Sequence, residues 1–372
     1  MNRTFFLHFF IFLCLLLCGC ITEFEPKGID EVEGILVVEG FITDDESVIT
    51  LGQSKGITYD DSDRDMTPYR VVDAKVFIEC DDGTQWSAAN QDLGQYIIQT
   101  GKLNPERLYR LKIEHEGHEY RSEFASPMVS SEVDSVFWTK RGSEQPVNIH
   151  VATHAPDSTV QYYRWSYRED WQTFAQVIIP ERKDLSVMCS KKYSSRDILI
   201  GTSEQTASEQ LITRIAEISP RDDRFMFLYR IDVTQNVISK RAYNYYTNIK
   251  KNAQQTGSLF AHIPSELKGN ITCITDPSRP VIGYIDVSSA TRGRLYIYPE
   301  YVYEPLVEDC KIRNWYSPLY GGIPIPEDCI YYSYENNQIV EFRCADCTAA
   351  GGRPINELPD DWPYQYPTED RD

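Results

Sequence analysis

The stretch YRLKIEHEGHEYRSEF, Tyr109–Phe124, decides the fold class of this chain. Apolar and polar side chains alternate on both sides of Glu116-Gly117, a pair that suits a tight turn. Alternation with a period of two is typical of strands that bury one face. The stretch therefore predicts a β-hairpin.

Similar short strands surround this hairpin. They are ILVVEGFI, SVITLGQ after the turn at residues 44–46, VVDAKVFIEC closed by Asp82-Gly83, and GQYIIQT. No helical periodicity interrupts them. We therefore expect residues 32–128 to form an immunoglobulin-like or transthyretin-like β-sandwich, followed by a linker at 125–135.

The next region keeps the period of two but is richer in aromatic residues. In VQYYRWSYRED, residues 160–170, one strand face carries Tyr163, Trp165 and Tyr167, and the other carries Arg164, Ser166 and Arg168. RFMFLYRIDVTQNVIS, residues 224–239, alternates in the same way. We interpret the aromatic faces as core; the alternative is a stacking platform for sugars or peptides.

One helix is predicted within this β region, at residues 239–254. Ser239 is a good N-cap, and an apolar stripe follows at helical spacing. We expect residues 133–305 to form a second, fibronectin-like β-sandwich domain with this helix inserted, and residues 306–372 to form a Cys-rich C-terminal cap and tail. The fold class is therefore mainly β with two sandwich domains.

The N-terminus has the pattern of a targeting segment. The apolar stretch FFLHFFIFLCLLL is too short to span a bilayer comfortably. Leu17-Cys18-Gly19-Cys20 follows it and resembles a bacterial lipobox. We expect a lipoprotein signal peptide at 1–19, a lipid on Cys20 and a tether over 20–31; the alternatives are an ordinary secretory signal or a retained membrane anchor.

The charge of the chain restricts its partners. The formal net charge is -19, and loss of residues 1–19 removes only Arg3, a positive charge. A strongly acidic protein is a poor partner for nucleic acid or for an anionic lipid surface. We expect no nucleic-acid partner.

Cysteines beyond Cys20 predict disulfides, because thiols outside the cytoplasm are mostly oxidised. Their number is odd, so at least one is free, and Cys80 in a strand pattern is the best candidate. Spacing does not determine the pairing; our expectation joins Cys189 to Cys273 and pairs the C-terminal cysteines among themselves. The disulfide candidates are Cys189, Cys273, Cys310, Cys329, Cys344 and Cys347.

Two acidic or histidine-rich stretches raise the question of a metal. Asp61, Asp63 and Asp65 have the opening spacing of a calcium loop, but Met66 and Val72 stand where an EF-hand needs Gly and Glu. A looser calcium site remains the alternative to a solvated loop. HEGHE, residues 115–119, is one residue short of the zinc motif H-E-x-x-H and lies at a turn, so we expect a hairpin tip.

Recognised signatures of catalysis are absent from the sequence. It contains no nucleophile elbow, P-loop or dinucleotide fingerprint. CADC, residues 344–347, lacks the following helix that a redox pair needs, and a zinc ribbon would need a second close pair. We expect no catalytic residues, no resident metal and no cofactor.

Several stretches together resemble one family. They are GILVVEGFIT, VDAKVFIECDDG, YYRWSYRE, SSRDILIGTS, the long segment from SKRAYNYYTNIKK to VIGYIDVSS, and CADCTAAGGRPINELPDDWP. The chain is similar across 32–365 to Bacteroidetes outer-membrane lipoproteins that contain a domain of unknown function, DUF4249. Here PDDWP replaces the family's usual Lys-Pro-then-Trp ending.

The resemblance implies a location and a partner but no catalytic residues. Members are typically encoded near TonB-dependent outer-membrane receptors, which implies an accessory lipoprotein of nutrient uptake or surface assembly. Acidic residues after the lipidated cysteine, here Glu23 and Glu25, are compatible with exposure on the cell surface. Our leading hypothesis is a non-catalytic binding protein that partners such a receptor barrel and takes a peptide or glycan ligand. The alternatives are an extracellular glycan or peptide hydrolase, and a surface adhesin or structural lipoprotein.

Overall fold

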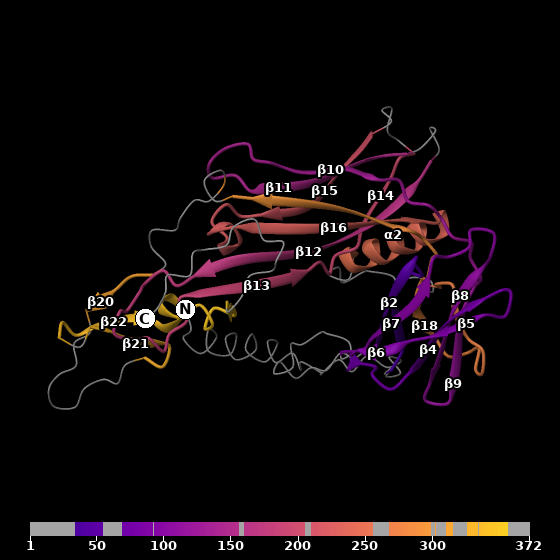
Figure 1. Cartoon of the computed structure of the whole chain (residues 1–372), viewed down its shortest axis with the longest axis horizontal. Coiled ribbons are helices and arrows are strands. Elements are labelled where there is room, and N and C mark those ends of the chain that lie inside the picture. Colours follow the sequence, from indigo (N-terminus) through magenta and orange to yellow (C-terminus); the bar gives the residue numbers. More distant parts are fainter. Residues whose placement is uncertain are drawn as a thin grey trace, which may run out of the picture.

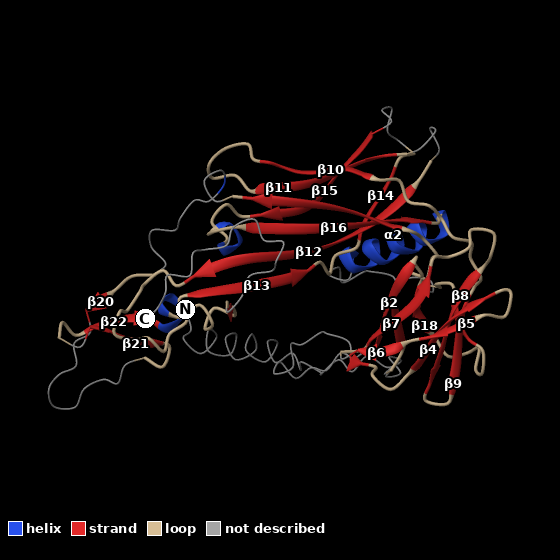
Figure 2. Cartoon of the chain, viewed as in Figure 1, coloured by secondary structure: helices blue, strands red, loops and turns tan. Residues whose placement is uncertain are grey.

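The computed structural model describes residues 34–54, 69–91, 93–155, 160–204, 210–255, 268–298, 302, 310–314, 326–333 and 335–355. Across these residues the chain is mainly β, as predicted, with several sheets and little helix (Figures 1 and 2). A β-rich sandwich lies at one end of the long axis, a long-stranded second unit lies beside it, and a small cap lies at the other end.

The first unit packs two sheets against each other. One sheet runs β18 (Val281–Gly283), β1 (Leu36–Gly40), β2 (Asp45–Gln53), β7 (Gln95–Gly101) and β6 (Ala89–Gln91), with β3 (Tyr69–Arg70) beside β2. The other runs β17 (Ile271–Cys273), β9 (His118–Ser122), β8 (Tyr109–His115), β4 (Lys75–Cys80) and β5 (Gln85–Ser87).

The opening hairpin forms as predicted. β8 alternates buried and half-buried residues along its whole length, so its apolar side chains face the core between the sheets. Glu116 and Gly117 at the turn both have positive φ, 49° and 76°. Paired positive φ values match the twist of the flanking strands.

Two edge strands of this first sandwich come from far along the chain. β18 pairs in parallel with β1, and β17 pairs antiparallel with β9. Ile271, Ile285 and Val287 bury their side chains in the same core. The chain therefore returns to the first sandwich after building most of the second unit, and the boundaries expected from sequence do not anticipate this return.

The second unit also has two facing sheets. The smaller runs β10 (Val133–Thr139), β11 (Val147–His154) and β15 (Gln210–Ile218). The larger runs β19 (Ala290–Ile297), β16 (Tyr229–Ile238), β12 (Tyr162–Phe174), β13 (Met188–Ser194) and β23 (Arg353–Pro354), with β14 (Leu199–Thr202) beside β12 and the short 3-10 helix η2 (Asp223–Phe225) before β16.

The aromatic faces of β12 and β16 form the core between these sheets. Tyr163 and Trp165 are buried there with Tyr229, Ile231 and Val233. The interpretation of this face as core is confirmed for Tyr163 and Trp165, which are fully enclosed and offer no platform for a ligand; Tyr167 packs against the same cluster but is half-buried.

The inserted helix, α2 (Lys240–Gln255), begins where predicted. The Ser239 hydroxyl accepts a hydrogen bond from the backbone N–H of Ala242 at 3.1 Å, which makes Ser239 the N-cap. Ala242, Tyr245 and Tyr246 pack with Tyr284 in a small apolar cluster. The described residues contain no helix long and apolar enough to cross a membrane.

The cap contains a small sheet, β20 (Arg313–Asn314), β22 (Gln338–Glu341) and β21 (Cys329–Ser333), and the short helix α4 (Phe342–Ala345). Two disulfides hold it: Cys310 bonds to Cys344 within the cap, and Cys189 on β13 bonds to Cys347. The cap is therefore attached covalently to the larger sheet of the second unit.

The predicted Cys189–Cys273 pair is wrong. Cys273 lies on β17 inside the core of the first sandwich, whereas β23 pairs with β13 and brings the cap against Cys189. Cys273 and Cys329, both disulfide candidates, are free and buried. Cys80 is free, as predicted.

Candidate functional site

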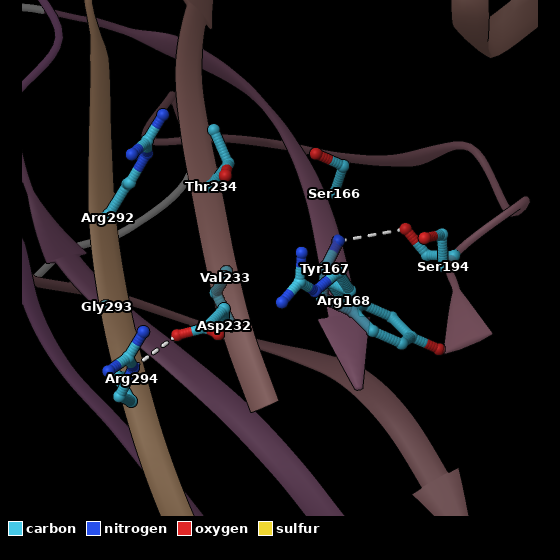
Figure 3. A pocket seen from close by; sticks show the side chains of 11 residues that line it. Ser166, Tyr167, Arg168, Ser194, Asp232, Val233, Thr234, Arg292, Gly293 and Arg294 are labelled. Carbon is cyan, nitrogen blue, oxygen red and sulfur yellow. Dashed lines mark hydrogen bonds and ion pairs between the residues drawn. The ribbon is translucent and has the colours of Figure 1, made fainter. Parts of the chain in front are cut away.

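A pocket of about 650 Å³ lies on the polar face of the larger sheet of the second unit. Three arginines from two strands line it: Arg168 on β12, and Arg292 and Arg294 on β19 (Figure 3). We call it the arginine pocket. Its volume falls within the range of small-ligand sites, roughly 300–1,000 Å³.

Strand register places the lining residues in two rows. In one row Arg168 pairs with Asp232 on β16, and Asp232 pairs with Arg294 on β19. In the next row Ser166 pairs with Thr234, which pairs with Arg292. Neighbouring members of a row share a face because paired residues in a sheet project to the same side.

A glycine separates the two arginines of β19. A Cβ added at Gly293 would lie 2.6 Å from Cγ2 of Val136 and 2.8 Å from Cγ1 of Val133, both on β10. The inner face of β19 therefore touches the facing sheet at this point, and a side chain there would push the two sheets apart. Gly293 keeps β19 in place while its two neighbours project to the opposite face.

A buried ion pair holds Arg168, one of the three arginines of the pocket, in place. Arg230 donates from Nη2 to Oδ2 of Asp170 at 2.8 Å, and both side chains are nearly inaccessible to solvent. The same carboxylate oxygen accepts from Nε and Nη2 of Arg168, each at 3.2 Å. Arg168 is therefore oriented by a carboxylate that is itself held in place.

Asp232 orients the second arginine in a similar way. It accepts from Nε of Arg294 at 2.5 Å and lies 3.4 Å from Nε of Arg230. Arg292 differs: among the residues that the structure describes, its guanidinium has no ion-pair or hydrogen-bond partner. Figure 3 shows Arg292 projecting beside Thr234, two strands from Arg168.

The pocket reverses the sign of the surrounding charge. Three guanidinium groups and one carboxylate, Asp232, are among the described residues that line it, on a chain with a net charge of -19. The hydroxyls of Ser166, Ser194 and Thr234 add donors that have no partner in the described part of the chain. This donor set suits carboxylate, sulfate or phosphate groups, which accept several hydrogen bonds in a plane or a fork.

Burial raises the pKa of three carboxyl groups in the described part of the chain, those of Glu169, Asp222 and Asp286. Burial raises the pKa of Glu169, whose Oε1 accepts from the Tyr229 hydroxyl at 2.6 Å and whose Oε2 lies 3.3 Å from Nε of Arg224. Burial also raises the pKa of Asp222, which caps η2. None of the three lines the arginine pocket, so the pair of carboxyl groups with raised pKa that the hydrolase hypothesis expects in one cleft is not found there.

The candidates from the sequence fall elsewhere. Cys20 and the three aspartates Asp61, Asp63 and Asp65 lie outside the described residues. His115 and His118 face each other across the hairpin tip, as expected for a turn. In the described residues no three His, Cys, Asp or Glu side chains gather as a metal site would require.

The sequence analysis placed Ser166 and Arg168 on one strand face but did not identify them as part of a site. The alternation in β12 separates Ser166 and Arg168 from the aromatic face, but an exposed polar face is ordinary in a strand. The second signal is TRGR, residues 291–294, in which two arginines share one strand face. Only the pairing of β19 with β16 and of β16 with β12 brings these segments together.

Comparison with known proteins provides a family and no annotated relative. No curated protein matches the chain. The family model described as "Domain of unknown function (DUF4249)" matches residues 21–294, a range that contains every residue named above as lining the arginine pocket. The chain belongs to the DUF4249 family.

Proposed function

We propose that this protein is a lipid-anchored binding protein of the bacterial outer membrane that holds an anionic ligand in the arginine pocket. In this role it is an accessory to a TonB-dependent receptor in nutrient uptake or surface assembly. The observation that carries the binding role is the cluster of Arg168, Arg292 and Arg294 in one pocket of a strongly acidic chain. Such a cluster of positive charge attracts an anion, whereas an acidic surface repels it.

The arrangement favours binding because its donors are already oriented. Arg168 donates from Nε and Nη2 to Asp170, and Arg294 donates from Nε to Asp232 and from Nη1 to the Tyr296 hydroxyl. A guanidinium has five N–H donors in a fixed plane, so an arginine held by one carboxylate can still bind a second. Pre-orientation reduces the side-chain entropy that a ligand must otherwise overcome.

The anchoring role is supported by the sequence. An apolar stretch precedes Leu17-Cys18-Gly19-Cys20, and a polar segment follows it. A lipid on Cys20 would hold the protein at a membrane while the tether lets the β units reach a partner. Glu23 and Glu25 favour the outer face of that membrane.

Fatty-acid labelling in cells tests the anchor. We expect an alkyne-tagged fatty acid to label the wild-type protein and Cys18→Ala, because Cys18 leaves with the signal, but not Cys20→Ala. Equal labelling of Cys20→Ala and wild type would refute lipidation at this position.

Binding of small anions tests the pocket. The full lipoprotein in detergent is titrated with carboxylated, sulfated and neutral sugars by calorimetry. We expect Arg292→Glu to weaken anion binding by tenfold or more, since a charged hydrogen bond contributes about 1.5–3 kcal/mol. The matched control is Arg141→Glu, an exposed arginine outside the pocket, which should bind as wild type does.

Co-purification tests the partner. We expect a TonB-dependent receptor to be recovered with the wild-type protein from native outer membranes. Loss of the protein should then reduce uptake of the receptor's substrate. Recovery of no receptor together with attachment to matrix polymers would favour the adhesin alternative.

A further inference from the structure

We infer that the anionic group of the ligand binds over Thr234, between Ser166 and Arg292, and that Asp232 keeps a second anionic group out of the neighbouring row. The class of ligand that follows is a small molecule with one carboxylate or sulfate group among hydroxyl groups. This inference rests on the proposed function, because it names the contacts and the ligand class for the same pocket.

The central strand of the pocket decides where an anion can bind. β16 supplies the middle residue of both rows, Thr234 in one and Asp232 in the other. An anion above Asp232 would lie close to a carboxylate, which repels it. An anion above Thr234 meets a hydroxyl, which can donate a hydrogen bond. The row of Ser166, Thr234 and Arg292 is therefore the favourable one, and we call it the Thr234 row.

The Thr234 row is complementary to a single oxyanion. Figure 3 shows Thr234 between Arg292 and Ser166, the two residues that pair with it. Directly paired residues have Cβ atoms roughly 4.5–5.5 Å apart, so side chains from the three strands can contact one ligand group together. In the described part of the chain, neither hydroxyl has a hydrogen-bond partner and Arg292 has no ion-pair partner. All three groups can therefore turn their donors toward a ligand.

The row combines a fixed hydroxyl with a cation that can adjust. β16 is paired on both sides, and the branched side chain of Thr234 has few rotamers, so its hydroxyl has little freedom. Arg292 has a long side chain and can follow the ligand. Arg168 is the diagonal neighbour of Thr234, at a spacing of roughly 7–8 Å that a long side chain can bridge. It can therefore add a hydrogen bond at the side of the same anion.

Asp232 limits what the rest of the ligand can be. Its carboxylate accepts from Nε of Arg294 at 2.5 Å and lies 3.4 Å from Nε of Arg230, which keeps it on the floor of the pocket. A carboxylate accepts hydrogen bonds but donates none, so it favours a hydroxyl of the ligand and disfavours a second anionic group. Specificity of this kind comes from an unfavourable contact with the wrong ligand.

Calorimetry with matched probes on the full lipoprotein in detergent tests the ligand class. Gluconate, glucarate and glucitol share an open chain of six carbons and carry one, two and no carboxylates; glucose 6-sulfate supplies a single sulfate. We expect gluconate or glucose 6-sulfate to bind, which shows the preferred anionic group, and glucitol not to bind measurably. Glucarate should bind no more than threefold more tightly than gluconate, although it has twice as many carboxylates.

Variants of the Thr234 row locate the anion, measured with whichever singly charged probe binds more tightly. We expect Thr234→Val to weaken binding at least threefold, because it removes the hydroxyl and keeps the shape, and Thr234→Ser to retain it. Ser166→Ala should weaken binding more than Ser194→Ala, since Ser194 pairs with Arg168 outside this row. Arg141→Gln, outside the pocket, should bind as wild type does, and circular dichroism confirms that each variant is folded.

A substitution of Asp232 tests the exclusion of a second anion. We expect Asp232→Asn to raise the affinity for glucarate relative to gluconate at least fivefold over the same ratio in wild type. The ratio is taken within one variant, so a general effect of the substitution on the pocket cancels. An unchanged ratio would overturn the role assigned to Asp232.

The outcomes separate this inference from the proposed function. If the singly charged probes bind and Arg292→Glu weakens them, but Thr234→Val binds as wild type does, the pocket binds anions and the assignment to the Thr234 row is overturned. Binding of glucarate more than threefold tighter than gluconate overturns the ligand class. If none of the anionic probes binds, the proposed binding function itself fails.

Discussion

Arg168 and Arg294 each share a guanidinium between a neighbouring carboxylate and the open pocket. The buried residues Asp170 and Arg230 lie behind Arg168 and hold it in place. Asp170 and Arg230 are buried together, so neither can lose its partner without leaving a charge in a region of low dielectric. The orientation of the Arg168 side chain in the pocket therefore depends on the Asp170–Arg230 ion pair, whose residues are not among those that line the pocket.

Removing one member of this pair should be costly. We expect Arg230→Met to lower the free energy of unfolding by about 3–5 kcal/mol, because Asp170 is left buried with less compensation. The double variant Asp170→Leu with Arg230→Met should lose less, since no buried charge remains and Arg168 is half exposed. Urea unfolding measures both, and a double variant less stable than the single one would contradict the argument.

Glu169 lies on the core side of β12, and its burial predicts that the stability of the fold depends on pH. Burial raises its folded-state pKa above the unfolded value, so its contribution to stability is present at low pH and is lost as pH rises through the folded pKa. We expect the stability of wild type relative to Glu169→Gln to fall as the pH rises above the ordinary pKa of a glutamate, about 4.3, until the raised folded-state pKa is passed. A difference that grows with pH would show that ion pairing with Arg224 outweighs burial.

At the scale of elements, β12 joins three roles in one strand. Tyr163, Trp165 and Trp171 pack in the core, Ser166 and Arg168 line the arginine pocket, and residues 168–174 pair with β13. β13 in turn carries Cys189, which fixes the cap. β13 therefore connects the cap, through Cys189, to the strand that carries Ser166 and Arg168.

The two disulfides should differ in their effect on stability. Cys189–Cys347 joins residues 158 apart in sequence, and Cys310–Cys344 joins residues 34 apart. In the loop-entropy view the longer loop contributes about 1 kcal/mol more. We expect Cys189→Ala with Cys347→Ala to lower the denaturation midpoint further than Cys310→Ala with Cys344→Ala, measured in guanidinium without reductant. Equal losses would mean that local packing of the cap dominates.

At the scale of the whole molecule, the two β units are not successive folding units. Residues 268–289 leave the second unit, add β17 and β18 to the first, and return as β19. Asn270 connects the two ends of this segment. Its side-chain amide donates a hydrogen bond to the Ile285 carbonyl at 2.7 Å and accepts one from the Ile285 N–H at 2.9 Å. The helix α2 lies at the junction, where Asp286 accepts from the Ser239 N–H.

This return predicts that the first sandwich needs the distant segment. We expect a fragment of residues 32–131 to be unfolded or aggregated, because the core loses Ile271, Ile285 and Val287, each contributing roughly 1.5–3 kcal/mol, and two strand edges become open. Addition of residues 268–289 through a flexible linker should restore cooperative thermal unfolding by circular dichroism; the control carries the same segment in scrambled order. A fragment that folds alone would refute the dependence.

The sequence by itself determined what neighbouring residues control. Period-two alternation predicts β8, β12 and β16 with their buried faces, and Ser239 with its apolar stripe predicts α2, because these patterns depend on contacts within a few residues. Three features belong to the tertiary structure alone: the Cys189–Cys347 bond, the return of residues 268–289, and the arginine pocket. Each requires a pairing register between segments far apart in the chain. Since one residue of slip would turn Arg168, Arg292 or Arg294 to the opposite face, local sequence cannot specify the site.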